Sequence, residues 1–365
     1  MRVHLVTPFG VPDLDSVIEV PLVQPRTEPA GPRIEVPATG LRSIPRRILP
    51  KRTMAALRQW KDVPDFDRHW AERARQAVQR KGVRADWLIT TSPPESVHGV
   101  GRELANSCGA RWCAELRDSW VDDSHRAHVR GVRALVEERL ARRWLGKADA
   151  LTAVDPLIAG EAARLTSGRV PVIEIPHFSD PPVATNGPRL EIGSDLALLH
   201  SGGFTLSDRK RRLDTLLAVL DPVHHARRAQ GLGGIRLHIT GRLSQSEAEL
   251  AAMRADGDSP GCAVHAHGPV SLAQSRALQQ RADALLLFIP DGSRALPGKF
   301  AEYALSGRPI FYVGPPHMRL RANRPDMLQP VEALATASVG DSGPVDEFYD
   351  ALANARALND ALSAL

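Results

Sequence analysis

The chain alternates short apolar runs with longer segments of helical periodicity, and this alternation constrains its fold more than any other feature. Parallel strands that are buried on both faces have nearly continuous apolar sequences. Each such strand needs a long crossover, usually a helix, before the next strand can pair beside it. The alternation therefore predicts a layered α/β fold built on parallel sheets.

The apolar runs form two series, which are separated by a segment rich in Pro, Gly, Ser and Asn at 177–194. In the first series we expect strands at 3–7, 86–92, 111–116, 150–154 and 170–176, with helices at 67–81, 95–107, 126–147 and 156–166. In the second we expect strands at 196–203, 235–241, 263–268, 284–289 and 309–314, with helices at 209–220, 244–254, 271–282 and 298–306. An Ala/Leu-rich helix is expected in 345–365.

A chain of 365 residues is too long for one core of usual size, so two domains are expected. We predict a Rossmann-like domain at 1–178, a linker at 179–194, a second Rossmann-like domain at 195–344 and a C-terminal helix at 345–365. Tandem doubly wound domains of this kind bind ligands at the carboxyl ends of their strands, facing a central cleft.

Composition and charge limit the classes of molecule that the protein is expected to bind. The net charge of +5 favours anionic partners, whereas 5% aromatic residues without basic-aromatic interleaving argue against nucleic acid. No apolar run approaches the roughly 20 residues that span a bilayer, and the first residues do not resemble a signal peptide. Three cysteines without metal-ligand spacing favour a reducing, cytoplasmic setting.

The stretch "ALPGKFAEYALSGRPI" at 295–310 follows an apolar strand and so falls at the carboxyl edge of a sheet. A Pro-Gly start lets a ligand approach the backbone, and Lys299 adds a charge that suits a phosphate. Glu302 lies one turn further on the same helical face, where its carboxylate suits a ribose diol. The alternative is an exposed ion pair between Lys299 and Glu302.

This stretch resembles the donor-site signature of the family-4-like, retaining glycosyltransferases of the GT-B fold. "ADWLITTSPPESVH", "RWCAELRDSW" and "LLHSGGFTLSDRKRRLDTLLAVL" are similar to further segments of that family and occur in its order. The resemblance covers roughly residues 86–314 and rests more on the order of the motifs than on any one of them.

The resemblance implies transfer of a sugar from a nucleoside-diphosphate sugar to an acceptor. By position, Glu302 would bind the donor ribose and Lys299 the diphosphate, after the turn formed by Pro297 and Gly298. Further donor contacts would come from Gly202, Gly203, Lys210, Arg211, Gly241, Gly268 and Val270. Because these cations and amides can stabilise the leaving diphosphate, and no Asp-rich metal motif stands in the expected place, we expect no metal and no other cofactor.

Three polar residues of the first half are candidates for catalysis. His98 follows the Pro-Pro turn, and Arg117 and Asp118 directly follow a strand. Each has a structural alternative, since a lone His is more often a core residue and Arg117 could pair with Asp118.

Residues 41–61 contain seven basic residues and no acidic one. Met54, Leu57 and Trp60 share one helical face, so the segment suits an anionic lipid surface or a phosphorylated, lipid-linked acceptor. A basic loop exposed to solvent is the equal alternative. We therefore expect a cytoplasmic protein, with peripheral contact to the inner membrane face left open.

Other functions remain open at this point. The start of the chain has one glycine, Gly10, where many members of the family have a Gly-Gly loop and a long helix. A degenerate GT-B protein that binds a nucleotide sugar or a partner transferase is thus an alternative, as is a nucleotide-sugar epimerase. The acceptor, whether a sugar, a lipid-linked or a small molecule, and the identity of the sugar and nucleotide do not follow from the sequence.

Overall fold

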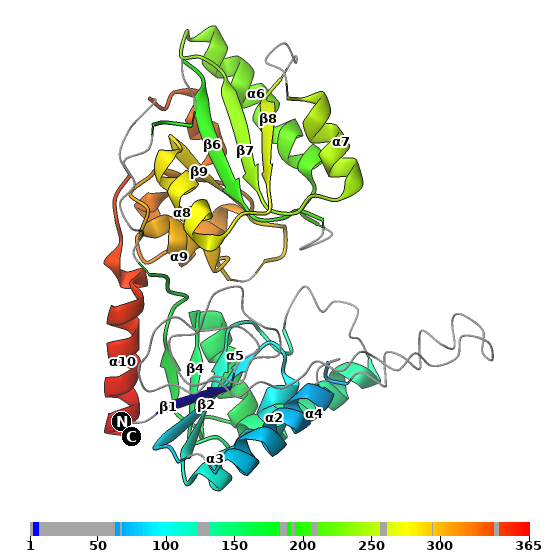
Figure 1. The fold of residues 1–365 in the computed structure, drawn as a ribbon, viewed down its shortest axis with the longest axis vertical. Helices are drawn as coiled ribbons and strands as arrows, with labels where there is room; N and C mark the ends of the chain where they lie inside the picture. Colours follow the sequence, from blue (N-terminus) through cyan, green and yellow to red (C-terminus); the bar gives the residue numbers. More distant parts are fainter. Residues whose placement is uncertain are drawn as a thin grey trace, which may run out of the picture. The chain divides into compact units, whose positions relative to one another are not determined.

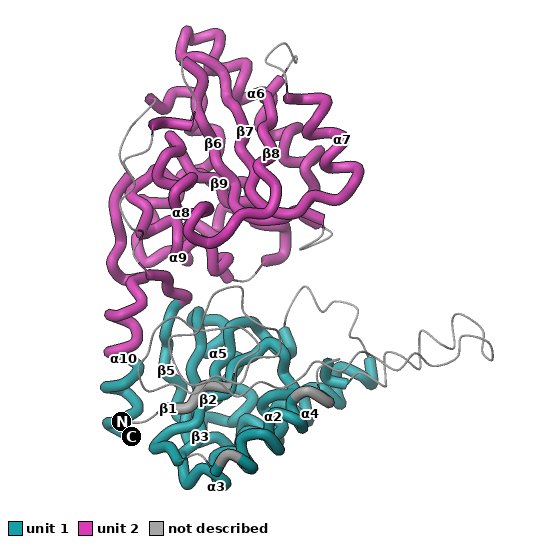
Figure 2. The backbone as a smooth tube through the Cα atoms, viewed as in Figure 1, with its two compact units in different colours: residues 1–176, 357–365 teal, residues 177–356 magenta. Residues whose placement is uncertain are grey.

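The computed structural model describes the backbone of 3–6 and residues 63–65, 68–82, 84–122, 131–180, 182, 188–190, 194–205, 210–255, 261–293, 295–338 and 343–365. The chain divides into two compact units, which Figure 2 colours separately. Unit 1 contains Met1–Pro176 and Ala357–Leu365, and unit 2 contains His177–Arg356. The predicted domain boundaries at residues 178, 194 and 344 stay predictions.

Unit 1 contains a parallel sheet in the order β1-β2-β3-β4-β5; Figure 1 labels β1, β2 and β4 of this sheet. Its strands are β1 (Val3–Val6), β2 (Trp87–Ser92), β3 (Arg111–Leu116), β4 (Ala150–Ala153) and β5 (Val172–Glu174). Its helices are α2 (Arg68–Lys81), α3 (Ser96–Cys108), α4 (Val132–Leu145) and α5 (Pro156–Thr166), followed at the end of the chain by the last turns of α10 (Ala351–Ala364). The five strands and the helices expected at 67–81, 95–107 and 156–166 are confirmed within a few residues. The helix expected at 126–147 is confirmed as α4 from Val132 onward, and residues 126–130 lie outside the described part of the chain.

Both faces of the first sheet are covered. On one face α3 packs closely on the buried Trp112, because a Cβ at Gly101 would lie 2.2 Å from the indole. On the other face Leu358 and Leu362 of α10 pack against Trp87 and neighbouring strand residues. The last turns of the chain therefore complete a core that is otherwise built from its first half.

Unit 2 contains a parallel sheet in the order β11-β10-β9-β6-β7-β8. Its strands are β6 (Leu196–Ser201), β7 (Ile235–Thr240), β8 (Ala263–Gly268), β9 (Ala284–Phe288), β10 (Ile310–Val313) and β11 (Leu328–Pro330). Its helices are α6 (Leu213–Ala229), α7 (Gln245–Met253), α8 (Leu272–Arg281), α9 (Lys299–Ala304) and the 3₁₀ turns η2 (Pro316–Arg321), η3 (Pro325–Met327), η4 (Val331–Ala335) and η5 (Glu347–Tyr349). Read from β8 to β11, this is the doubly wound order 3-2-1-4-5-6.

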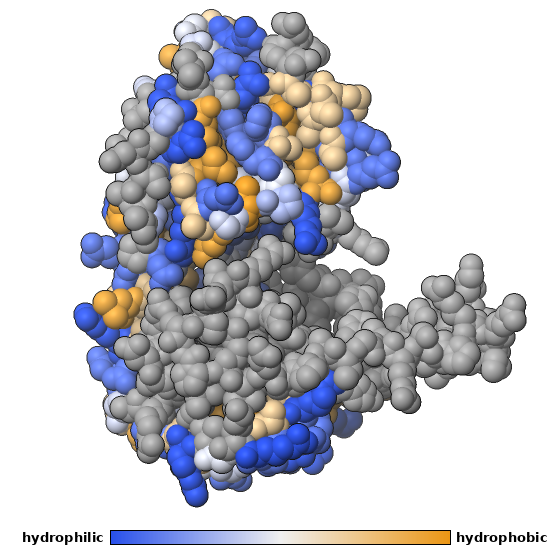
Figure 3. Space-filling model, in the orientation of Figure 1, coloured by the Kyte–Doolittle hydropathy of each residue, from blue (hydrophilic) through white to orange (hydrophobic). Residues whose placement is uncertain are grey.

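Two cores sandwich the second sheet. One packs α6, α7 and η4 on one face, and the other packs α8, α9 and η2 on the opposite face. On the face of unit 2 that Figure 3 shows, the apolar residues form small groups between polar ones. Among the described helices, none combines the length and the hydropathy that crossing a bilayer requires.

Candidate functional site

The strand order of unit 2 indicates where a doubly wound domain of this kind is expected to bind a ligand. The chain runs from β6 outward through β7 to β8, then returns to β9 on the other side of β6 and continues to β11. In doubly wound sheets, ligands bind at such a switch point, outside the carboxyl ends of the strands. The residues just past the carboxyl ends of these two strands are therefore the candidate site.

Glycines with positive φ follow three neighbouring strands at this edge. Gly202 follows β6 with φ of +124°, Gly241 follows β7 with φ of +132°, and Gly268 ends β8 with φ of +72°. They approach one another closely, since a Cβ at Gly241 would lie 2.7 Å from the carbonyl carbon of Gly202. L-residues rarely adopt these φ values, so the sequence keeps this edge bare of side chains.

Lys299 lies directly over the first of these glycines. A Cβ at Gly202 would be 2.7 Å from Cε and 3.1 Å from Nζ of Lys299, so the long side chain of Lys299 follows the bare backbone. The side chain is mostly buried, and no ion pair or hydrogen bond to it is found among the described residues. Burial lowers the pKa of Lys299, nearby Arg211 lowers it further, and Glu302 opposes both.

The first turn of α9 is less open than its sequence suggests. The helix has six residues, and the amides of Phe300 and Ala301 already donate to the carbonyls of Pro297 and Gly298, at 2.8 and 3.2 Å. Backbone donors for an anion are thus fewer here than a bare helix end would supply. The cationic group that this turn presents is the Lys299 ammonium.

Glu302, one turn further along α9, is held from α8. The carboxamide of Gln279 donates to Oε2 of Glu302 at 3.2 Å and also lies 3.3 Å from Ser201 Oγ. The backbone N–H of Ser201 donates to the hydroxyl of Tyr303 at 2.8 Å. Burial raises the pKa of Tyr303 to about 12, so this hydroxyl stays protonated. The carboxyl end of β6 is therefore fixed to both helices.

More basic groups lie around Lys299. His200 is buried in β6, and its Nδ1 donates to the carbonyl of Leu286 at 3.0 Å. Burial lowers the pKa of His200 to about 3, and the charges of Lys299 and Arg211 add to this effect. Lys210 is exposed, and its ammonium lies 3.4 Å from the carbonyl oxygen of Asp291 in the loop that follows β9. His200 is therefore neutral near pH 7, and the positive charge of this region comes from Lys299, Arg211 and Lys210, which favours a polyanionic ligand.

The remaining predicted donor residues all follow strands of unit 2. Gly203 is half-buried beside Gly202, and Val270 is half-buried two residues after β8. Gly298 is exposed and in ordinary contact with His177, whose Nδ1 would lie 3.5 Å from a Cβ at this glycine. Pro297, half-buried, begins the turn before α9. The assignment of these residues to a nucleotide sugar stays a prediction.

His98 of unit 1 is part of a buried network. It is 1% exposed, and its Nδ1 lies 2.8 Å from Thr90 Oγ1, which also accepts from the indole N–H of Trp112 at 2.9 Å. Burial lowers the pKa of His98 to about 3, so its imidazole is neutral near pH 7. Its predicted catalytic role stays a prediction.

Arg117 and Asp118 directly follow β3, and their catalytic assignment also stays a prediction. Arg117 is half-buried, and its backbone N–H donates to the carbonyl of Ser92 at 3.3 Å. Asp118 is exposed. Both residues occupy the carboxyl edge of the first sheet, where doubly wound domains bind ligands.

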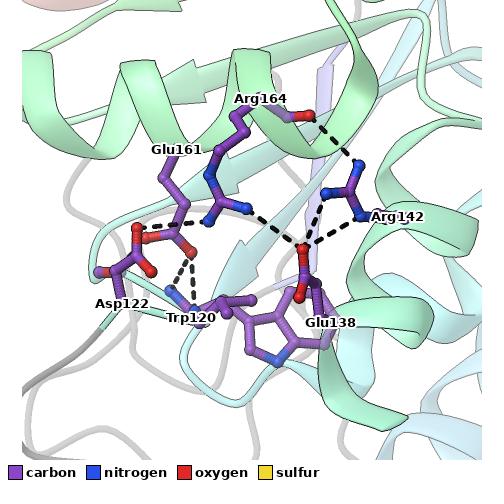
Figure 4. A network of polar contacts seen from close by, with 8 residues as sticks. Trp120, Asp122, Glu138, Arg142, Glu161 and Arg164 are labelled. Atoms are coloured by element: carbon purple, nitrogen blue, oxygen red, sulfur yellow. Dashed lines mark hydrogen bonds and ion pairs between the residues drawn. The ribbon is translucent and has the colours of Figure 1, made fainter. Parts of the chain in front are cut away.

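Glu161 of α5 fixes the loop that begins with these two residues. Its carboxylate accepts from the backbone N–H groups of Trp120 and Val121, at 3.1 and 2.7 Å (Figure 4). Beside it, Arg164 joins Asp122 to Glu138. These contacts hold the carboxyl end of β3 in one conformation.

Sequence reasoning missed Gln279, Ser201 and Tyr303, which hold the site together. Tyr303 lies within the quoted stretch, and its neighbour Glu302 was the only signal pointing to it. Gln279 and Ser201 carry no local signal, because a lone Gln on a polar helix or a Ser ending a strand is commonplace. The segments 7–62, including Gly10 and the basic residues 41–61, lie outside the described residues.

The fold of the whole chain matches solved structures. Sucrose-phosphate synthase from Thermosynechococcus elongatus matches with a TM-score of 0.56 and 13% identity, covering 100% of this chain and 99% of that one. HepE from Anabaena, in complex with UDP and glucose, matches with a TM-score of 0.52 and 11% identity, covering 100% of both chains. No protein-family model matches the sequence, and neither does any curated protein sequence. The chain thus has the GT-B fold, with two tandem Rossmann-like domains.

Proposed function

We propose that the protein is a retaining, metal-independent glycosyltransferase that takes its sugar from a nucleoside diphosphate. The observation that carries the proposal is the ammonium of Lys299, mostly buried and packed over the bare backbone of Gly202 at the switch point of unit 2. A desolvated cation without an ion-pair partner among the described residues is stabilised by an anionic ligand. Glu302 on the same helix then suits the ribose next to a diphosphate.

The comparison supports the same ligand class. HepE from Anabaena has been solved with UDP and with UDP-glucose, at TM-scores of 0.52 and 0.51 to this chain. UDP is therefore the first nucleotide to test. Lys299, Arg211 and Lys210 would stabilise the charge that develops on the leaving diphosphate, which is the main electrostatic demand of the reaction. Arg117, Asp118 and His98 are the proposed catalytic residues on the acceptor side.

Calorimetric titration of UDP, GDP, ADP and dTDP tests the proposal. We expect one ribonucleotide to bind and Glu302→Ala to weaken it about 10- to 150-fold, because hydrogen bonds to a charged acceptor are worth about 1.5–3 kcal/mol. Glu332→Ala, an exposed glutamate on η4, is the matched control and should bind as the wild type does. If none of the four nucleotides binds, the donor site is refuted.

Product analysis tests the chemistry. With the preferred donor and an acceptor, retention means that the product has the anomeric configuration of the donor, which NMR detects directly. Turnover that survives EDTA supports metal independence. Donor converted to its epimer without an acceptor would instead identify an epimerase.

Peripheral membrane contact through 41–61 is a separate part of the proposal. Seven basic residues without an acidic one suit anionic lipid. Co-sedimentation with phosphatidylglycerol vesicles, lost at high salt and absent with phosphatidylcholine vesicles, is the expected result. Equal absence from both kinds of vesicle removes the membrane contact and leaves the transferase proposal unaffected.

A further inference from the structure

Gln279 is a buried polar residue at the centre of the donor site. It is 1% exposed, although it belongs to α8, a helix whose residues are mostly polar. Its carboxamide nitrogen lies 3.2 Å from Glu302 Oε2, 3.3 Å from Ser201 Oγ and 3.4 Å from Ser275 Oγ. Burying an amide is costly unless it is hydrogen-bonded, and here three oxygens from three elements surround its N–H groups.

Two of the partners, Ser201 and Ser275, are placed independently of Gln279. Ser201 is fixed through its backbone N–H, which donates to Tyr303. Ser275 precedes Gln279 by one helical turn on α8 and also contacts Ser201, at 3.4 Å between the hydroxyls. The carboxamide therefore lies beside two hydroxyls that are already in place, and among the residues that the structure describes its charged partner is Glu302.

This contact restricts Glu302. A glutamate on a short helix samples several rotamers, and immobilising such a side chain costs about 0.5–1.5 kcal/mol when a ligand has to do it. Gln279 does so in advance by binding Oε2. The carboxamide is neutral, so this contact does not pair the Glu302 carboxylate with an opposite charge, and hydrogen bonds to an ionised acceptor are the stronger kind.

We propose that Gln279 is a positioning residue that orients Glu302 toward the ribose diol and thereby makes the site select ribonucleotides over 2′-deoxyribonucleotides. The inference rests on the proposed donor site. Gln279 holds one carboxylate oxygen, and the other accepts hydrogen bonds from the ribose hydroxyls. A nucleotide without the 2′-hydroxyl then loses a bond to an oriented, charged acceptor, whereas a freely rotating Glu302 adjusts to either sugar.

Calorimetry with UDP and 2′-deoxy-UDP measures this selectivity as the ratio of the two dissociation constants. We expect the wild type to prefer UDP by about tenfold, as one hydrogen bond to a charged group implies. Gln279→Leu should bring the ratio close to one, mainly by weakening UDP. Gln245→Leu is the matched control, because Gln245 also donates to a glutamate, Glu249, at 3.0 Å, but on an exposed part of α7, and it should keep the wild-type ratio.

Gln279→Glu adds a readout that a merely structural role does not change, and it serves where the Leu variant does not fold. Two facing carboxylates repel each other at pH 8, so the ratio should fall there. It should recover at pH 5.5, as the buried carboxyl takes up a proton and donates to Glu302. Thermal unfolding of each variant confirms that it is folded before titration.

The outcomes separate the two proposals. If the wild type binds neither nucleotide, the donor site itself fails. If the wild type prefers UDP and both Gln279 variants keep that preference at each pH, the donor site stands and the role of Gln279 is overturned. Equal weakening of UDP and 2′-deoxy-UDP in the variants overturns it too, because a general loss of structure leaves the ratio unchanged.

Discussion

Gly202→Ala tests the central contact of the site, because Gly202 is where the backbone gives room to the Lys299 side chain. A Cβ there would lie 2.7 Å from Cε of Lys299, which is too close for two carbon atoms that are not bonded to each other. The atom in the way is near the end of a flexible chain, so the lysine moves and the fold survives. We therefore expect the ammonium to leave its place over the glycine.

The substitution should lower two quantities, the free energy of unfolding and the affinity for UDP, which are measured separately. The φ of +124° strains any L-residue, which lowers the free energy of unfolding by about 1–3 kcal/mol. Displacing the ammonium removes a charge-assisted hydrogen bond to the diphosphate, worth about 1.5–3 kcal/mol. UDP binding should therefore weaken about 10- to 150-fold.

Calorimetric titration of UDP into four proteins separates displacement of the lysine from general damage. These are the wild type, Gly202→Ala, Lys299→Ala and the double variant. If Gly202→Ala acts by displacing Lys299, the double variant binds UDP no more weakly than Lys299→Ala does, because the same interaction cannot be lost twice. Uridine, which lacks the phosphates, should bind all four alike.

Gly231→Ala is the matched control. Its φ of +73° is also positive, but a Cβ there would have no atom within 4 Å, so it adds strain without a new contact. It should lower stability and leave UDP binding unchanged. Fully additive losses in the double variant, or equal weakening by Gly231→Ala, would refute the reasoning.

Three further predictions concern stability. Tyr303→Phe leaves the buried N–H of Ser201 without its acceptor and should lower the unfolding free energy of unit 2 by about 1–3 kcal/mol, measured by urea denaturation. Glu161→Ala leaves two backbone N–H groups of the loop after β3 without their acceptor, and unit 1 should lose about 2–3 kcal/mol in the same assay. His98 in unit 1 and His200 in unit 2 have pKa values lowered to about 3, so the unfolded chain takes up protons first as the pH falls below 6.5. Each unit should therefore lose about 2 kcal/mol per histidine between pH 7 and pH 5, and a transition temperature that stays constant over that window would contradict this.

Strands such as β2, β4, β6 and β9 were predictable because each is a fully buried, largely apolar run with a helix close by in the sequence. β11 is short and partly exposed, and it was not expected. β3 was expected at 111–116 and spans Arg111–Leu116. Three consecutive apolar residues at 112–114 and Leu116 at the end give this segment a clear strand signal. The sequence was misleading at α6, which was expected to end at residue 220 but continues to Ala229. Pro222 suggests an end, yet Val223 and Arg227 beyond it are buried, and tertiary packing outweighs the lost hydrogen bond.

The candidate site was predictable only where chemistry and position coincide. Lys299 and Glu302 lie in one short segment after a strand, so local sequence brings them together. Gln279 contacts Glu302 from another helix, 23 residues away in the sequence. Neither segment has a local sequence pattern that indicates this contact. The Thr90 partner of His98 is likewise a product of tertiary packing, since it belongs to the strand before the Pro-Pro turn.

The return of the chain in α10 has a consequence for synthesis. The segment 357–365 is translated after all of unit 2, yet Leu358 and Leu362 pack on Trp87 and Ile89 in the first sheet. While the ribosome is still producing unit 2, that face of the first sheet lacks its cover and is a binding surface for chaperones. A fragment that stops at Pro176 should therefore aggregate on expression, and co-expression of 345–365 as a separate peptide is the way to rescue it.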